Sequence, residues 1–208
     1  MRARIAVMVS GGGTNLQALI DSQGKVLTSG EIVLVISNSA SAYALQRAKN
    51  AGIDTEVVLK KELGSQQALE GRILELLSAY EIDVIILAGF MSILSADFTR
   101  RYPERILNVH PSLIPSFCGA GFYGLKVHEA ALAYGVKVTG ATVHFVNEIP
   151  DGGKIIAQKA VPVLPGDTPQ TLQRRVMEQA EWILLPQAAQ AVCEELAGSS
   201  RTGQTGCV

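Results

Sequence analysis

The sequence predicts an α/β fold: a mostly parallel twisted sheet with helices on both faces, extended by an antiparallel hairpin in the C-terminal half. Short apolar runs of strand length alternate with segments of helical periodicity, which is the pattern of a parallel sheet covered by helices. These runs are rich in Val and Ile and apolar on both faces, as buried parallel strands are. They are RIAVMVS, EIVLVISN, TEVVL and DVIILAG. A length of 208 residues suits one domain, which we expect over residues 1–197.

Several segments between and after these runs are expected to be helices. Residues 41–52 have helix composition and end at Gly52, and residues 126–135 have a similar composition. In residues 65–80 the apolar side chains form one helical stripe. They are Leu69, Ile73, Leu76, Leu77 and Tyr80. The closing helix is expected to begin with Thr168 as N-cap and Pro169 at its first position, and to be kinked or restarted at Pro186.

The predicted hairpin joins VKVTGATVHFVN to KIIAQKAVPV through the turn PDGG. Asp-Gly and Gly-Gly pairs supply the positive φ angles that tight turns need, which favours two antiparallel strands here. The last stretch, residues 198–208, is small and polar, so we expect a disordered tail.

Composition limits the classes of function. The chain is 48% hydrophobic with a formal net charge of −1, which argues against disorder and against a general field for nucleic acid or membrane. No apolar run approaches the roughly 18 residues of a membrane helix, and Ile5–Val9 is too short for a signal peptide. The three cysteines are widely spaced without a CxxC pair, as in a reducing compartment. We therefore expect a soluble, cytoplasmic protein.

A glycine loop, SGGGTNLQALI, follows the first predicted strand and opens a helix. Backbone N–H groups at such a helix start form an anion site. The loop lacks the spacing of a dinucleotide fingerprint and the Gly-Lys pair of a P-loop, so a single phosphate near Gly13, Thr14 and Asn15 is the functional interpretation. A tight turn with Thr14 or Asn15 as helix cap is about equally well supported.

Two polar residues end the fifth predicted strand, RILNVH. Asn108 and His110 are two apart, so both side chains face the same way at the carboxyl edge, where open α/β sheets bind ligands. Pro111 ends the strand there. Asn can hold an oxyanion and His can transfer a proton near neutral pH. Asp151 in the hairpin turn is the best candidate for a supporting carboxylate, with Glu148 as the runner-up. Judged alone, Asp151 is better explained as an ordinary turn residue, because Asp is enriched in such turns.

The remaining histidines carry less weight. His128 is expected to be a surface or cap residue of its helix, and His144 either a core histidine or a supporting group behind the site. The histidines do not cluster in the sequence as metal ligands do, so no metal site is predicted.

Five stretches together resemble the phosphoribosylglycinamide formyltransferase family. They are VSGGGTNLQALI, LAGFMSILS, LNVHPSLIPSF, VHFVNEIPDGG and GDTP followed by RV, and the resemblance covers residue 4 to about 195. Asn-x-His-Pro-Ser-Leu and Asp-Gly-Gly are common to the folate-dependent formyl-transferring families, whereas the SGGGTN loop is typical of this one. The chain leaves no room for the extra domains of methionyl-tRNA formyltransferase or formyltetrahydrofolate deformylase. The resemblance implies a Rossmann-like formyltransferase fold.

The resemblance also implies an activity, which is formyl transfer from 10-formyltetrahydrofolate to the amine of glycinamide ribonucleotide in purine biosynthesis. It implies that Asn108, His110 and Asp151 are catalytic, with no metal. The implied ribonucleotide ligands are Gly13, Thr14, Asn15 and Glu181. The implied folate ligands are Gln66, Met91, Ser92, Ile93, Leu94, Asn147, Glu148, Ile149 and Pro150. No nucleic acid or membrane partner is implied, and a homodimer is one expectation for the assembly.

Some residues depart from the family pattern. Gln66 stands where some members carry a basic residue near the folate tail. Glu181 is followed by Trp182 rather than histidine, with one residue more than the family pattern, and the loop containing Cys118 is longer than in some relatives. Two alternatives stay open: the same folate site with water or another amine as acceptor, and a non-catalytic nucleotide-binding module that uses only the glycine loop.

Overall fold

The computed structural model describes residues 2–202 of the chain. They form two compact units, one containing the chain up to Ser92 and from Pro186 onward, the other Ile93–Leu185. The expectation of one domain over 1–197 stays a prediction. The expected tail begins at residue 198, but the last helix continues to Thr202, and residues 203–208 lie outside the described part.

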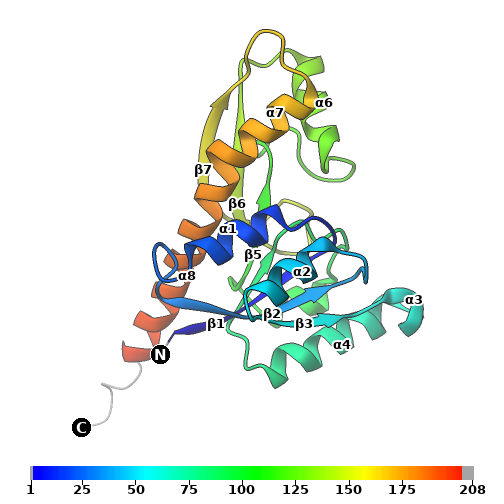
Figure 1. Cartoon of the computed structure of the whole chain (residues 1–208), viewed down its shortest axis with the longest axis vertical. Coiled ribbons are helices and arrows are strands. Elements are labelled where there is room, and N and C mark those ends of the chain that lie inside the picture. The colour runs from blue at the N-terminus through cyan, green and yellow to red at the C-terminus, as the bar shows by residue number, and fades with distance from the viewer. Residues whose placement is uncertain (1, 203–208) are drawn as a thin grey trace. The chain divides into compact units, whose positions relative to one another are not determined.

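The first unit contains a parallel sheet with the strand order β3-β2-β1-β4. Its elements in chain order are β1 (Ala3–Val9), α1 (Thr14–Ser22), β2 (Gly30–Ser37), α2 (Tyr43–Asn50), β3 (Asp54–Val57), α3 (Lys60–Leu63), α4 (Gln66–Ala79) and β4 (Val84–Leu87). α1 and α2 lie together on one face of these strands and α4 lies on the other (Figure 1). This is the arrangement predicted from the alternating pattern.

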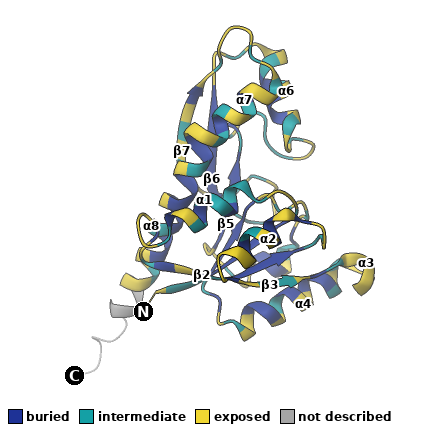
Figure 2. Ribbon diagram, viewed as in Figure 1, coloured by how far each residue is buried: buried dark blue, intermediate teal, exposed yellow. Residues whose placement is uncertain are grey.

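Burial explains why these segments form strands and helices. The strands β1 and β4 are apolar on both faces, and residues 5–9 and 84–86 have no solvent exposure (Figure 2). The stripe predicted on α4 is buried at Leu69, Ile73, Leu76 and Leu77, while Tyr80 is its half-buried C-cap. The unit therefore has a continuous apolar core on both sides of its sheet.

The second unit contains antiparallel strands in the order β5-β6-β7. Its elements are α5 (Ala96–Thr99), β5 (Ile106–His110), α6 (Leu125–Tyr134), β6 (Val138–Phe145), β7 (Ile155–Pro162), α7 (Pro169–Val176) and the π-helix η1 (Met177–Glu181), followed by α8 (Trp182–Thr202). β6 and β7 are the predicted hairpin. The predicted fold class, a mostly parallel α/β fold with an antiparallel hairpin, is confirmed.

The closing helices agree with the sequence at their start and differ farther on. Thr168 is the N-cap of α7 and Pro169 its first residue, and Thr171 completes a capping box. The helix does not restart at Pro186, because α8 continues through that residue, and a kink there stays a prediction. The interruption comes earlier, where η1 makes one wide turn. Within residues 2–202, no helix is long and apolar enough to cross a membrane.

Asp167, just before α7, offers a test of what anchors this helix. Its carboxylate accepts two hydrogen bonds from Arg175 at 2.5 and 2.6 Å and one from the Leu164 N–H at 2.7 Å. Replacing Asp167 by Asn leaves a largely buried guanidinium without its anion, so we expect the free energy of unfolding at pH 7 to fall by about 2 kcal/mol in urea titrations.

The same pair predicts a pH dependence. The Arg175 hydrogen bonds hold the pKa of the Asp167 carboxyl well below its usual range. Its stabilisation is therefore complete above the unfolded value near 3.8 and is lost as the pH falls below it. The Asp97→Asn control removes an exposed ion pair and should change stability by less than about 0.5 kcal/mol. Equal losses in both variants would contradict the anchoring role.

Candidate active site

Strand pairing in the second unit places four polar side chains on one sheet face. In the antiparallel register of β5 and β6, Asn108 lies opposite His144 and His110 lies opposite Thr142. Directly opposed residues point to the same face, and residues two apart on a strand do so as well. The predicted pair Asn108 and His110 therefore meets two further polar residues from β6.

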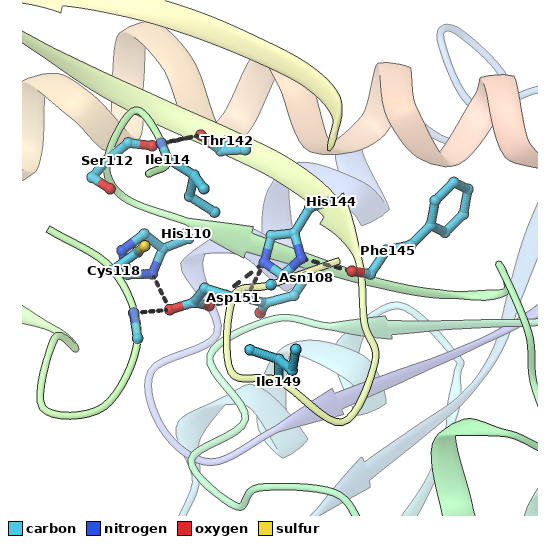
Figure 3. Close-up of polar contacts among 12 residues, drawn as sticks. Asn108, His110, Ser112, Ile114, Cys118, Thr142, His144, Phe145, Ile149 and Asp151 are labelled. Atoms are coloured by element: carbon cyan, nitrogen blue, oxygen red, sulfur yellow. Dashed lines mark hydrogen bonds and ion pairs between the residues drawn. The ribbon is translucent and has the colours of Figure 1, made fainter. Parts of the chain in front are cut away.

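Asp151 reaches this face from the loop that follows β6, as Figure 3 shows. Its Oδ2 accepts a hydrogen bond from the Gly119 N–H at 2.8 Å and lies 3.4 Å from His110 Nδ1. Its Oδ1 lies 3.5 Å from both His144 Nε2 and Asn108 Nδ2. The structure thus brings together the three residues that the sequence selected as a catalytic trio, Asn108, His110 and Asp151.

The backbone of Asp151 has φ of 55°, in the left-handed region. Asp enters this region more readily than most residues, but at some cost in energy. Burial opposes ionisation of the carboxyl, yet the hydrogen bonds from His144 and the Gly119 N–H, together with His110, outweigh it and lower the pKa of Asp151. The site therefore holds an ionised carboxylate near neutral pH. An aspartate that served only to form the turn would not need its carboxylate to contact Gly119, His110 and His144.

His110 is buried, and both of its ring nitrogens face acceptors. Nε2 lies 2.8 Å from the Phe117 carbonyl oxygen, which can only accept, so this nitrogen carries hydrogen. Nδ1 faces the Asp151 carboxylate. This is the hydrogen-bonding pattern of a protonated imidazole, which can donate a proton or a hydrogen bond to a reacting oxygen.

His144 is also buried, and its contacts decide between the two roles left open for it. Nδ1 donates to the carbonyl of Phe145 at 2.7 Å, while Nε2 faces both Asn108 Nδ2 at 3.2 Å and Asp151 Oδ1 at 3.5 Å. His144 is therefore a supporting group behind the trio, and it orients the Asn108 amide.

The loop Phe117–Gly124 contributes backbone groups that sequence reasoning missed. The Phe117 carbonyl and the Gly119 N–H contact His110 and Asp151, but a backbone contact leaves no signature in residue type. Cys118 lies between them and donates weakly to Pro115 O at 3.3 Å. Burial, and next the charge of Asp151, raise the pKa of the Cys118 thiol, so it is a poor nucleophile.

The expectation for His128 is wrong, because its side chain has no solvent exposure. The helix α6 turns this face inward, and neither ring nitrogen has a hydrogen-bond partner among the described residues. Burial, and next the charge of nearby His110, lower the pKa of His128 to about 4. It is a neutral core histidine.

The glycine loop lies in the first unit, between β1 and α1. Gly13 is the N-cap of α1, so the expected caps Thr14 and Asn15 are instead its first two residues. Gly13 has φ of 72°, and a Cβ there would lie 2.6 Å from the Ala44 Cβ, so this position requires glycine. Arg47, unnoticed in the sequence, donates to the Gly12 carbonyl at 2.8 Å and fixes that peptide.

The predicted folate residues lie in loops of both units. Met91 and Ser92 follow β4 in the first unit, where the Met91 N–H donates to Ser10 Oγ at 2.8 Å and Asn38 donates to Ser92 Oγ at 2.9 Å. Ser10 and Asn38 were not predicted, because single polar residues at strand ends are common. The remaining first-unit residue is Gln66, which begins α4 and donates to Glu70.

The other predicted ligands belong to the second unit. Ile93 is largely exposed and Leu94 is buried. Asn147 accepts a hydrogen bond from the Ile149 N–H at 2.9 Å, which shapes a loop whose residues Glu148, Ile149 and Pro150 are exposed. Glu181 is buried in η1. Over the described residues, no group of three or more His, Cys, Asp or Glu side chains could hold a metal ion.

The sequence of this chain is similar to those of known proteins over most of its length. Residues 3–188 match the formyl transferase family. The chain belongs to that family. It is 42% identical over 176 residues to phosphoribosylglycinamide formyltransferase of Haemophilus influenzae, covering 85% of this chain and 81% of that protein.

Other relatives of this formyl transferase are longer or have solved structures. This chain is 45% identical to the chicken trifunctional purine biosynthetic protein adenosine-3. The match covers 99% of this chain but only 20% of that longer relative. A crystal structure of glycinamide ribonucleotide transformylase 1 from Symbiobacterium toebii superposes with a TM-score of 0.87 at 42% identity, covering 93% of this chain and 89% of that one.

His128 offers a test in this formyl transferase. Unfolded histidine binds a proton with a pKa near 6.5, whereas the buried ring has a pKa of about 4, so stability falls as the pH drops through this window. Relative to His128→Leu, the parent should lose about 2 kcal/mol of unfolding free energy between pH 7 and pH 5.

Urea titrations at the two pH values provide the measurement. The Lys126→Leu variant, which changes an exposed residue of the same helix, should follow the parent at both. A parent and His128→Leu variant that weaken equally on acidification would show that the imidazole is not held neutral.

Proposed function

We propose that this chain transfers the formyl group of 10-formyltetrahydrofolate to the primary amine of glycinamide ribonucleotide, giving formylglycinamide ribonucleotide and tetrahydrofolate in purine biosynthesis. The observation that carries the proposal is the cluster of Asn108, His110 and Asp151 on one sheet face, with the carboxylate within 3.5 Å of both partners. Family membership and the names of the relatives support this choice of donor and acceptor.

The reaction follows from the chemistry of the three side chains. The amine attacks the formyl carbon, and the carbonyl oxygen becomes the oxyanion of a tetrahedral intermediate. The Asn108 amide and protonated His110 stabilise that oxyanion, since both can present N–H donors. Asp151 stabilises the imidazolium and takes up the amine proton directly or through water. Collapse of the intermediate expels tetrahydrofolate as its N10 is protonated.

Both donors already have hydrogen-bond partners within the protein. His110 Nε2 contacts the Phe117 carbonyl at 2.8 Å, and the Asn108 amide nitrogen contacts His144 Nε2 at 3.2 Å and, more weakly, Asp151 at 3.5 Å. The weak Asn108 contact can be exchanged at little cost for an oxyanion, because hydrogen bonds to charged acceptors are the stronger ones. His110 must exchange its Nε2 hydrogen bond to the Phe117 carbonyl for one to the formyl oxygen.

The remaining ligand assignments are part of the proposal. Gly13, Thr14 and Asn15 bind the ribonucleotide phosphate at the start of α1, and Glu181 binds its sugar. The loops Met91–Leu94 and Asn147–Pro150 bind folate, the pterin through backbone groups, and Gln66 lies by its glutamate tail. The proposed steps need only proton transfer and oxyanion stabilisation, so they call for no metal. We place the enzyme in the cytoplasm, as a monomer or homodimer.

Formyl transfer tests the assignment directly. Consumption of 10-formyltetrahydrofolate is followed spectrophotometrically with and without glycinamide ribonucleotide. We expect turnover only with the ribonucleotide. His110→Ala should lower kcat by 10²–10⁴-fold through loss of the general acid, and Asn108→Ala by about 10²–10³-fold through loss of an oxyanion donor. Asp151→Asn should fall in the same range as His110→Ala.

Arg72→Ala, on the exposed face of α4, is the control and should keep parental activity. Circular dichroism and thermal unfolding establish that each variant is folded. Folate consumption without the ribonucleotide would assign water as the acceptor instead. Binding of the ribonucleotide without any turnover would make the chain a binding module and sink the catalytic assignment.

A further inference from the structure

Three residues stand side by side across the sheet of the second unit. His110 on β5 lies opposite Thr142 on β6, and Thr142 lies opposite Gln158 on β7. Thr142 has no solvent exposure, whereas Gln158 is exposed on the last strand. The row therefore leads from the proposed catalytic histidine to the surface through one buried hydroxyl.

The hydroxyl of Thr142 is fully used by the loop that follows His110. It donates its hydrogen to the Ser112 carbonyl at 2.7 Å and accepts from the Ile114 N–H at 3.1 Å and from Gln158 Nε2 at 2.9 Å. A hydroxyl has one donor and two acceptor positions, so no capacity remains for a substrate. Figure 3 shows Thr142 with Ser112 and Ile114 on the side of His110 away from Asp151.

Gln158 holds the same loop from the other side. Its Nε2 also donates to the Ile114 carbonyl at 3.0 Å, so the side chains of Thr142 and Gln158 together contact both the N–H and the carbonyl of Ile114. Within the loop, Ser112 Oγ donates to the Ser116 carbonyl at 2.5 Å. The backbone between His110 and Phe117 is thereby tied to two neighbouring strands.

The loop that follows His110 ends at Phe117 and Gly119, whose backbone groups contact His110 and Asp151. Phe117 has φ of 50°, a strained left-handed conformation for an aromatic residue, and its carbonyl faces His110 Nε2. Two residues later the Gly119 N–H donates to Asp151. A loop released at Ile114 would move both backbone groups, because only a few residues separate them from that anchor.

We propose that Thr142 and Gln158 are positioning residues, which hold the loop Ser112–Gly119 so that Phe117 and Gly119 align His110 and Asp151. The proposal rests on the proposed formyl transfer for its kinetic consequence. It assigns these two residues no contact with substrate. Their loss should therefore lower kcat and leave KM for both substrates within about twofold, because small misplacements of catalytic groups reduce the rate strongly.

The test compares four variants in the formyl transfer assay. Thr142→Val keeps the shape but removes all three hydrogen bonds, and should lower kcat by about 10- to 100-fold. Gln158→Met, at an exposed position, should lower it by about 3- to 10-fold. Thr142→Ser restores the hydroxyl and should recover most of the activity.

Thr139→Val is the matched control on the same strand. Thr139 is also buried, but its hydroxyl finds no hydrogen-bond partner within the described residues. This variant should keep parental kcat. If Thr139→Val and Thr142→Val lose activity equally, the effect comes from a general disturbance of β6 and the positioning role is wrong.

A second readout does not depend on turnover. In the parent, the backbone amide of Gly119 donates to Asp151, so its proton resonance should shift as that carboxylate titrates and its hydrogen exchange should be slow. Both properties should be lost in Thr142→Val and Gln158→Met and restored in Thr142→Ser. If the parent protein does not transfer formyl groups, the proposed function is wrong. The resonance and the hydrogen exchange of the Gly119 amide would still test the positioning role. Unchanged Gly119 behaviour in the folded variants would overturn that role.

Discussion

The candidate site depends on one half-buried carboxylate and the donors that surround it. Asp151 accepts a hydrogen bond from Gly119 and lies close to His110, His144 and Asn108. Removing an anion from water is costly unless donors and positive charge compensate. In the proposed reaction, His110 and Asn108 must therefore both stabilise Asp151 before substrate binds and donate hydrogen bonds to the reacting oxygen. The long distances to Asn108 and His144 are consistent with such a compromise.

The antiparallel pairing of β5, β6 and β7 places the residues of the site side by side on one sheet face. Each strand contributes alternate side chains to one face, so a row of three residues crosses the sheet at each step of the register. One row leads from Asn108 to His144 and serves the carboxylate. The next leads from His110 through Thr142 to Gln158 and serves the loop. In these rows, the residues proposed as catalytic thus lie on β5 and the supporting residues on β6 and β7. A register slip of one residue would turn every one of these side chains to the opposite face.

Much of this could be predicted from residue patterns, and the exceptions have physical reasons. The strands, the stripe on α4 and the capped start of α7 follow from periodicity and local hydrogen bonding, which are properties of neighbouring residues. The trio could be proposed because polar side chains at strand and turn ends carry recognisable chemistry. His128 was misjudged because α6 has a weak amphipathic pattern, and only tertiary packing turns that side chain inward. The contacts of Phe117 and Gly119 could not be foreseen, because the groups involved are common to every residue.

The wide turn η1 bears on how such a chain can change over evolution. A π-helix closes its hydrogen bonds over one residue more than an α-helix, so an inserted residue can be absorbed within a single turn while the helices on either side keep their own faces. Ala180 and Glu181 are both buried within that turn. A relative with an unbroken α-helix here would carry its equivalent residues shifted by one position beyond this turn. In such a relative, the position that matches the buried Glu181 in space would differ by one from the position that matches it in a count along the chain.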